Sequence, residues 1–321
     1  MNAREKKVLI TDDVHISLLE GLSAIGYECH YLPHISLSET RAIVAQYHGL
    51  VVNSKIWVDA AFLSLAPKLA FVARLGSGME IIDVVAAAER GVAVFSSPEG
   101  NRNAVAEHAM AMLLALANNL LRADREVRQF DWQREKNRGF ELAGKTVGIV
   151  GFGHTGRSFA QKLSGWDVEV LAYDKYKTDY TADFLYVRAA APDEICAQAD
   201  IISFHLPLTA ETKHLVDKNY LNKCKETVVI LNTSRGAVVC TEHLLAALAA
   251  KKIGGACLDV FENEKVGTFS AAEKDLYAQL YRFENVVLSP HIAGWTHQSK
   301  WRLSEVLLEK IGAWHFAQTK K

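Results

Sequence analysis

Three ionisable residues in the second half of the sequence have the types needed to reduce a 2-keto acid: Arg235, Glu264 and His291. A guanidinium can hold a carboxylate through two parallel hydrogen bonds. An imidazole can give a proton to a keto oxygen while a hydride reaches the carbon, and a nearby carboxylate favours the protonated imidazole. Each residue follows a segment that reads as a buried strand, and parallel strands end at one edge of a sheet. We therefore expect the three side chains to converge there.

Each of these residues also has a plain structural alternative. Arg235 could be a surface arginine after a strand, and His291 could be an ordinary loop histidine. Glu264 lies in a charged patch with Glu262 and Lys265, so its spacing alone fits a solvated surface equally well.

The segment before these residues predicts where a hydride donor would bind. An apolar strand over residues 146–150 is followed by a helix over 157–163 and a second strand over 168–173. Between the first strand and the helix stand three glycines at G-x-G-x-x-G spacing: Gly151, Gly153 and Gly156. Such glycines allow a tight turn, close approach of a pyrophosphate and close packing of the helix, whose N-terminus faces the phosphates. The order of these elements therefore predicts a dinucleotide site.

Asp174 ends the second strand and would accept hydrogen bonds from the ribose hydroxyls of the dinucleotide. A carboxylate there would repel the 2′-phosphate of NADP, so NAD is the expected cofactor. Lys175 and Lys177 could offset part of this repulsion.

Composition limits the classes of protein that the sequence can encode. A chain of 321 residues is too long for one compact core and suits two domains. With 50% hydrophobic residues, 23% charged residues and a net charge of −1, it resembles an ordinary globular protein and lacks the basic character of a nucleic-acid binder. We find no apolar run of membrane-spanning length and no signal peptide core. These features predict a cytoplasmic protein without a membrane or nucleic-acid partner.

The cysteines indicate a reducing compartment. The sequence has five of them, scattered and without a C-x-x-C pair. We therefore expect reduced cysteines that pack as small hydrophobic residues, and no metal site.

The order of the predicted elements indicates an α/β architecture. Short strands and helices alternate through the first hundred residues and again after the glycine motif. This alternation predicts two doubly wound parallel-sheet domains with a cleft between them. We expect a flavodoxin-like substrate-binding domain from residues 1–102 plus 296–321, and a Rossmann NAD-binding domain from residues 103–295.

Three segments within this alternation have less regular patterns. Residues 97–101 read as a loop that leads into a long, almost wholly apolar helix over 104–121. The charged segment 124–141 reads as a solvated helix face with a loop. A further strand is predicted over residues 184–187.

Taken together, these motifs resemble the D-isomer-specific 2-hydroxyacid dehydrogenase family over nearly the whole chain. The segments that carry the resemblance are Leu75-Gly76-Ser77-Gly78, Pro98-Glu99-Gly100-Asn101, Val105-Ala106-Glu107-His108, the glycine motif, His205-Leu206-Pro207-Leu208, Asn232-Thr233-Ser234-Arg235-Gly236, Leu258-Asp259-Val260 and Ser289-Pro290-His291-Ile292.

The resemblance implies roles for individual residues. Arg235 would anchor the substrate carboxylate, His291 would act as acid and base, and Glu264 would be its partner. The residues implied to line NAD, with Asp259 at the nicotinamide amide, are Gly151, Gly153, His154, Thr155, Gly156, Asp174, His205, Leu206, Pro207, Thr212, Thr233, Ser234, Asp259 and Gly294. Those implied to bind the substrate are Asn53, Arg74, Ser77, Gly78, Asn101 and Arg134. The resemblance also implies a homodimer formed through residues 104–141.

Within the family, short phosphoglycerate dehydrogenase-like members are the most similar. Arg74 stands where such enzymes place a basic residue near the phosphate, and Arg134 resembles an arginine that reaches in from a neighbouring subunit. Three positions depart from the pattern. Lys265 replaces a proline, Glu80 stands where aspartate is common, and Asn53 stands where arginine is frequent, although Lys55 is nearby.

Three functions follow as alternatives. The first is oxidation of 3-phosphoglycerate to 3-phosphohydroxypyruvate in serine biosynthesis. The second is reduction of a small unphosphorylated 2-keto acid such as glyoxylate, hydroxypyruvate or a pyruvate-like compound. The third is an NAD(H)-sensing binding protein similar to the family's corepressors. No regulatory domain is expected after residue 321.

Overall fold

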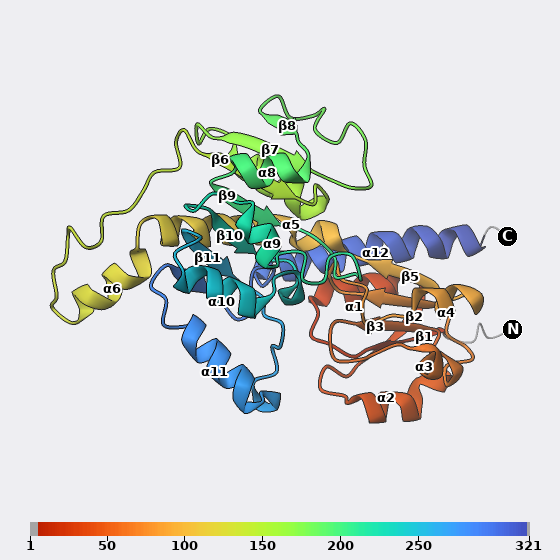
Figure 1. Cartoon of the computed structure of the whole chain (residues 1–321). Helices are drawn as coiled ribbons and strands as arrows, with labels where there is room; N and C mark the ends of the chain where they lie inside the picture. The colour runs from red at the N-terminus through yellow and green to blue at the C-terminus, as the bar shows by residue number, and fades with distance from the viewer. Residues whose placement is uncertain (1–5, 320–321) are drawn as a thin grey trace, which may run out of the picture. The chain divides into compact units, whose positions relative to one another are not determined.

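The computed structural model describes residues 6–319, which divide into two compact units. The first runs up to Arg102 and resumes at Trp295, and the second runs from Asn103 to Gly294. Each unit is built around its own parallel sheet (Figure 1). The predicted α/β fold with two doubly wound parallel sheets is confirmed.

The sheet of the first unit has five parallel strands in the order β2-β1-β3-β4-β5. This is the flavodoxin-like order, in which successive strands are added on one side of β1 and then, from β3 on, on its other side. Its strands are β1 (Lys6–Ile10), β2 (Tyr27–Tyr31), β3 (Gly49–Val52), β4 (Phe71–Arg74) and β5 (Ala93–Ser96).

Helices cover both faces of this sheet, so its central strand β3 is an apolar run that is buried along its whole length. Val8 and Ile10 pack into one buried cluster and Leu9 into another, and all three are fully buried. The cluster with Val8 includes Leu307 and Ile311 of α12, which returns to pack against α1. The helices are α1 (Ile16–Ala24), α2 (Leu37–Ile43), α3 (Ala60–Ser64), α4 (Val84–Glu89) and α12 (His297–Thr319).

The sheet of the second unit has seven parallel strands in the order β12-β11-β10-β9-β6-β7-β8. Strands β7 and β8 are added on one side of β6, and the strands from β9 on are added on its other side. This is the arrangement of a Rossmann fold, with β12 added at the far edge. The strands are β6 (Thr146–Val150), β7 (Glu169–Tyr173), β8 (Val187–Ala189), β9 (Ile201–Phe204), β10 (Val229–Asn232), β11 (Gly255–Leu258) and β12 (Val286–Leu288).

Buried clusters lie on both faces of the second sheet as well. One cluster contains Val147 and Ile149 of β6 with Leu113 of α5, and the other contains Val150 with Ile202 of β9. The helices are α5 (Pro98–Ala117), which begins in the first unit, α6 (Leu120–Arg128), α7 (His154–Leu163), α8 (Pro192–Gln198), α9 (Lys218–Asn222), α10 (Thr241–Ala249) and α11 (Ala271–Leu280).

Two predictions of local structure were wrong. Residues 97–101 are not a loop, because α5 already begins at Pro98. Proline is favoured in a first helical turn, and Gly100 is there for packing, since a Cβ would lie 2.7 Å from the backbone of Leu303. The apolar helix ends at Ala117, and Asn119, with a left-handed φ of 50°, separates it from α6.

The strand predicted over residues 184–187 begins only at Val187. Phe184 is buried, but it closes a turn in which its N–H donates to the carbonyl of Thr181.

Among the described residues, no single helix is long and apolar enough to cross a membrane, and only α5 and α6 together, bent by 63°, reach that length and composition.

Candidate active site

The three positions of the nucleotide motif require glycine for different structural reasons. Gly151 has a φ of +92°, and a Cβ there would lie 2.4 Å from the carbonyl oxygen of His205. A Cβ on Gly156 would lie 2.1 Å from the carbonyl oxygen of Gly151. A Cβ on Gly153 would meet no described atom within 4 Å. Packing therefore accounts for Gly151 and Gly156, whereas Gly153 leaves room for a ligand at the N-terminus of α7, which fits a bound pyrophosphate.

Asp174 lies directly beside this turn. Its carboxylate accepts hydrogen bonds from the backbone N–H groups of Phe152 (3.0 Å) and Tyr176 (3.1 Å). His154 and Thr155 form the first turn of α7, at the positive end of the helix dipole. The positions of these residues fit the ribose and phosphates of a dinucleotide.

Two buried polar atoms without hydrogen-bond partners lie after neighbouring strands. They are Nδ1 of His205, which follows β9, and Oγ1 of Thr233, which follows β10. A buried polar group without a partner is costly, so both atoms fit a site that a polar ligand completes. Burial lowers the pKa of His205 to about 4, which keeps its imidazole neutral.

The loops beside these atoms are held by their own hydrogen bonds. The hydroxyl of Thr212 donates to the carbonyl of Pro207 (2.7 Å) and so closes the turn after Leu206. The hydroxyl of Ser234 donates to the side chain of Asn232 (2.8 Å). These residues support the cofactor loops, and their predicted contacts with NAD remain predictions.

The loops that carry Arg235, Glu264 and His291 follow the adjacent strands β10, β11 and β12. A Cβ on Gly236 would lie 1.9 Å from the carbonyl group of Phe261, so the first two loops are in direct contact. The charge of Arg235 lies near enough to lower the pKa of Glu264. The three residues therefore come together as their positions at strand ends predict.

His291 and Glu264 form a close pair, with Nδ1 2.7 Å from Oε2. Burial raises the pKa of Glu264, but the hydrogen bond and charge of His291 outweigh it and leave that pKa below its usual value. His291 has a left-handed φ of 56°, which is costly for a residue with a Cβ. Such a conformation persists only where the surrounding structure enforces it.

That enforcement comes from Asp259, whose side chain is completely buried. Its carboxylate accepts hydrogen bonds from the hydroxyl of Ser289 (2.6 Å) and from the N–H groups of Ile292 (2.9 Å) and Ala293 (2.8 Å). His108 of α5 lies 2.9 Å from the same hydroxyl. Asp259 thus holds the loop on both sides of His291.

The sequence predicted only a nicotinamide contact for Asp259, and it predicted no role for Ser289 or Asn232. Asn232 also donates to the carbonyl of Arg235 (2.9 Å), which positions that loop. The pattern that could have identified Asn232 and Ser289 is a polar residue at the end of an apolar strand. Gly294, the last predicted cofactor residue, follows this loop at the end of the second unit.

Most of the predicted substrate residues lie in the first unit. Arg74 ends β4 beside β3, and its guanidinium would meet a Cβ on Gly76 at 1.9 Å, so it lies over the loop with Ser77 and Gly78. Asn53 follows β3, and its N–H donates to Asp12 (2.9 Å).

Two other predicted substrate residues have different settings. Asn101 lies inside α5, and its Oδ1 is buried without a partner. Arg134 lies in the exposed loop after α6.

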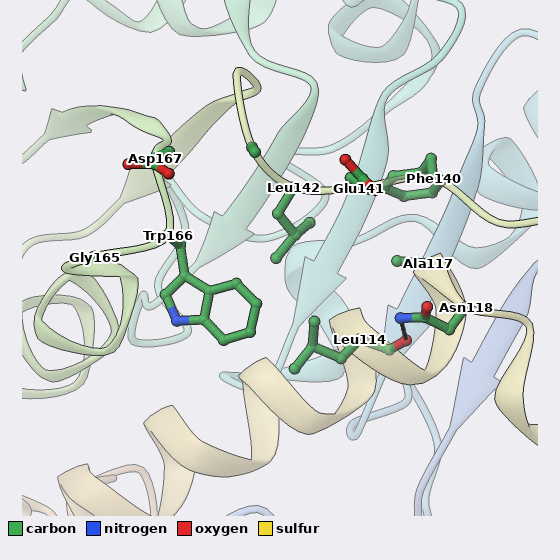
Figure 2. A pocket seen from close by; sticks show the side chains of 10 residues that line it. Leu114, Ala117, Asn118, Phe140, Glu141, Leu142, Gly165, Trp166 and Asp167 are labelled. Atoms are coloured by element: carbon green, nitrogen blue, oxygen red, sulfur yellow. Dashed lines mark hydrogen bonds between the residues drawn. The ribbon is translucent and has the colours of Figure 1, made fainter.

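A hollow of about 350 Å³ lies elsewhere in the second unit (Figure 2). Figure 2 shows Leu114, Leu142 and Trp166 around it. Residues 143 and 167, which also line it, precede β6 and β7, so it lies at the edge where these strands begin. The predicted cofactor loops lie where the strands end, so this hollow is separate from the candidate active site.

Comparison with known proteins agrees with this geometry. Residues 110–293 match the model of the D-isomer specific 2-hydroxyacid dehydrogenase NAD binding domain. The second unit is therefore an NAD-binding domain.

Related proteins of several kinds match over most of the chain. A D-3-phosphoglycerate dehydrogenase of Mycobacterium bovis is 38% identical over 95% of this chain and 56% of its own length. A hydroxypyruvate reductase of Thermotoga maritima is 33% identical over 87% of this chain and 88% of its own length. The chain spans little more than half the length of the phosphoglycerate dehydrogenases that it matches.

A solved structure gives the same result. The D-lactate dehydrogenase of Aquifex aeolicus, in complex with NAD and lactic acid, has a TM-score of 0.85 and 26% identity over 98% of this chain and 96% of its own. The chain belongs to the D-isomer specific 2-hydroxyacid dehydrogenase family.

Proposed function

We propose that this protein is an NAD-dependent oxidoreductase that interconverts a D-2-hydroxy acid and its 2-keto acid. The observation that carries the proposal is the 2.7 Å contact between His291 and Glu264. It lies on the same edge of the sheet as Arg235 and the loops of the NAD-binding domain. Family membership and these residues support the same reaction.

In the proposed reaction, NADH supplies a hydride to the keto carbon. Arg235 holds the substrate carboxylate through its guanidinium and so orients the keto group. His291 donates a proton to the keto oxygen, which yields the 2-hydroxy acid, and takes the proton back in the reverse direction. Glu264 accepts a hydrogen bond from Nδ1 and leaves Nε2 to face the substrate.

We infer that the substrate pair is 3-phosphoglycerate and 3-phosphohydroxypyruvate. Arg74 supports this choice, because it supplies a cation at the carboxyl edge of the first sheet beside Ser77 and Gly78. We also propose substrate-binding roles for Asn53 and Asn101 of this unit. The reaction would then belong to serine biosynthesis, in the cytoplasm.

A specific observation favours unphosphorylated acids as the second candidate. Asn53 brings no charge, and the amine of Lys55 donates to the carbonyl of Pro33 (2.5 Å). Of these three residues, Arg74 places its charge over the loop with Ser77 and Gly78. The hydroxypyruvate reductase relative, which this chain covers over 88% of its length, agrees with this alternative.

The test is NADH oxidation with 3-phosphohydroxypyruvate beside hydroxypyruvate and glyoxylate, compared as kcat/KM. A preference of about tenfold or more for the phosphorylated acid, lost in Arg74→Ala, would support the first candidate. No discrimination would favour the second. NADH binding without turnover of any 2-keto acid would contradict both and favour a sensing protein.

We further propose a homodimer formed through residues 104–141. The helix α6 has no buried residue, and Phe130 and Trp132 after it are 97% and 74% exposed. Figure 1 shows α6 and the following loop extending from the second sheet (yellow). Exposed aromatic residues of this kind favour an interface.

Light scattering after size exclusion would test the dimer. We expect Trp132→Glu to shift the protein toward the monomer, whereas Trp57→Glu, at a tryptophan that is 54% exposed, should leave the mass unchanged. A monomeric wild-type protein at micromolar concentration would contradict the proposal.

A further inference from the structure

The fold brings together a histidine, a cysteine and a glutamate that have no part in the proposed reaction. His214 lies in the segment after β9, Cys240 precedes α10, and Glu262 lies after β11. One imidazole nitrogen, the thiol sulfur and one carboxylate oxygen all lie within 4.8 Å of one another. We propose that these residues form a binding site for one zinc ion, with water completing its coordination.

The donor atoms suit zinc by type and by distance. Thiolate, imidazole and carboxylate together favour Zn²⁺ over Mg²⁺ or Ca²⁺, which prefer oxygen ligands. Tetrahedral zinc has bonds of about 2.0–2.3 Å, which place neighbouring ligand atoms roughly 3.2–3.8 Å apart. The present separations, from 2.6 Å between His214 and Glu262 to at most 4.8 Å, bracket that range.

The backbone beneath the site is already held in place. The N–H of His214 donates to the carbonyl of Ala237 (2.7 Å), and the N–H of Cys240 donates to the carbonyl of Val216 (3.1 Å). A parallel bridge between Val216 and Val239 joins the same two segments. Because these bonds need no ligand, metal binding would not have to order the segments that carry the first two donors.

Glu262 is oriented by a second contact, as metal-binding carboxylates commonly are. One of its oxygens accepts a hydrogen bond from the N–H of Thr241 (2.7 Å), and the other lies 2.6 Å from Nε2 of His214. Zinc would lie between that nitrogen and oxygen in place of the hydrogen, and it would displace the proton of the Cys240 thiol to solvent. Binding therefore releases protons, and the affinity should rise with pH.

The site is open to solvent on one side and closed on the other. Cys240 is buried at 8% exposure, whereas the side chains of His214 and Glu262 are 40% and 29% exposed. An ion could thus enter from solvent past the histidine and glutamate and meet the sulfur at the base. The site does not depend on the proposed dehydrogenase activity.

Cobalt offers a direct test, because Co²⁺ bound to a thiolate gives a sulfur-to-metal charge-transfer absorption in the near ultraviolet. We expect one equivalent of Co²⁺ to produce this absorption with the full-length protein and Zn²⁺ to remove it by displacement. Cys240→Ser should abolish the absorption. Cys29→Ser, at a partly buried cysteine of the first unit, should retain it.

Zinc affinity, measured by competition with a chromophoric chelator, gives a second readout. We expect His214→Gln and Glu262→Gln to weaken binding by about tenfold or more, and Cys29→Ser to leave it unchanged. The melting temperature of each metal-free variant shows whether its fold is retained. His214→Gln, at a partly exposed position, keeps the test valid if Cys240→Ser is unstable.

Two results would overturn the proposal. One is a wild-type protein that gives no thiolate absorption with Co²⁺. The other is an absorption that survives Cys240→Ser and disappears in the double variant Cys196→Ser/Cys224→Ser, because the metal would then bind to a different pair of cysteines.

Discussion

Nδ1 of His291 lies 2.7 Å from Oε2 of Glu264, although 27 positions separate the two residues in the sequence. The contact exists because β11 and β12 are neighbours and parallel, so their following loops meet at one edge. It also requires the left-handed backbone of His291, which Asp259 maintains through hydrogen bonds to Ile292 and Ala293. His291 and Glu264 thus form the contact on which the proposed reaction depends, and Asp259 holds the loop that carries His291.

The carboxylate anchor gives a first prediction. Arg235→Ala should raise KM for the 2-keto acid and lower kcat/KM by a factor that corresponds to about 2–5 kcal/mol, because a charged contact to the carboxylate is lost. NADH affinity, measured by fluorescence titration, should change little. Arg235→Lys should recover only part of the loss, since an ammonium cannot form the bidentate pair. If NADH affinity fell by the same factor as kcat/KM, the result would argue against Arg235 as the anchor of the substrate carboxylate.

The nucleotide glycines give a matched pair of substitutions. Gly151→Ala should lower the free energy of unfolding by more than about 1 kcal/mol, because its φ of +92° and the nearby carbonyl of His205 both exclude a Cβ. Gly153→Ala should leave that free energy nearly unchanged and weaken NADH binding by about tenfold or more. Urea denaturation and NADH titration measure the two effects. The assignment fails if Gly153→Ala binds NADH normally.

The support of the loop that carries His291 can be tested at Asp259. Replacement by alanine leaves one hydroxyl and two N–H donors without their acceptor, so the free energy of unfolding should fall by about 3 kcal/mol or more. Ser289→Ala removes one donor and should cost only about 1 kcal/mol. Urea denaturation of both variants gives the comparison, and equal losses would show that the carboxylate has no special role.

Acid should destabilise the protein through His205. Its pKa is lowered by burial from 6.5 to about 4, so the unfolded chain takes up a proton that the folded protein refuses. Stability from this residue is complete above pH 6.5, and it is lost progressively as the pH falls toward 4, by up to roughly 3 kcal/mol.

His205→Gln should therefore flatten the dependence of urea midpoints on pH between 6.5 and 4. His297→Gln, at an exposed histidine, should keep the wild-type slope. If His205→Gln kept the wild-type dependence of the urea midpoint on pH, His205 would not be the cause of the loss of stability in acid.

The sequence could predict those parts of the site that local pattern determines. The turn at Gly151 and the acid at Asp174 lie within one β-α-β segment, so strand, glycine spacing and helix identify them together. The positions of Arg235 and His291 at one sheet edge were predictable, because each residue follows an apolar strand and parallel strands end at one edge. The two parallel sheets followed from the alternation of short strands and helices.

Contacts between distant segments explain what the sequence could not show. Gly100 suggests a loop, yet it is a helical glycine made necessary by the backbone of Leu303. Asp259 is predicted to contact nicotinamide, and the sequence does not show that its buried carboxylate also binds the loop around His291. His214 and Cys240 form no sequence motif, because a bridge between strand-end segments brings them together.

The most direct test of the proposed reaction is NADH oxidation by wild-type protein and by His291→Ala in the presence of 2-keto acids, with NADH binding measured in parallel. Loss of the proton donor should reduce kcat by about 10²–10⁴-fold, with NADH affinity retained and a smaller loss in Glu264→Gln. A His291→Ala protein that turns over at nearly the wild-type rate would contradict the assignment of His291 as the acid and base.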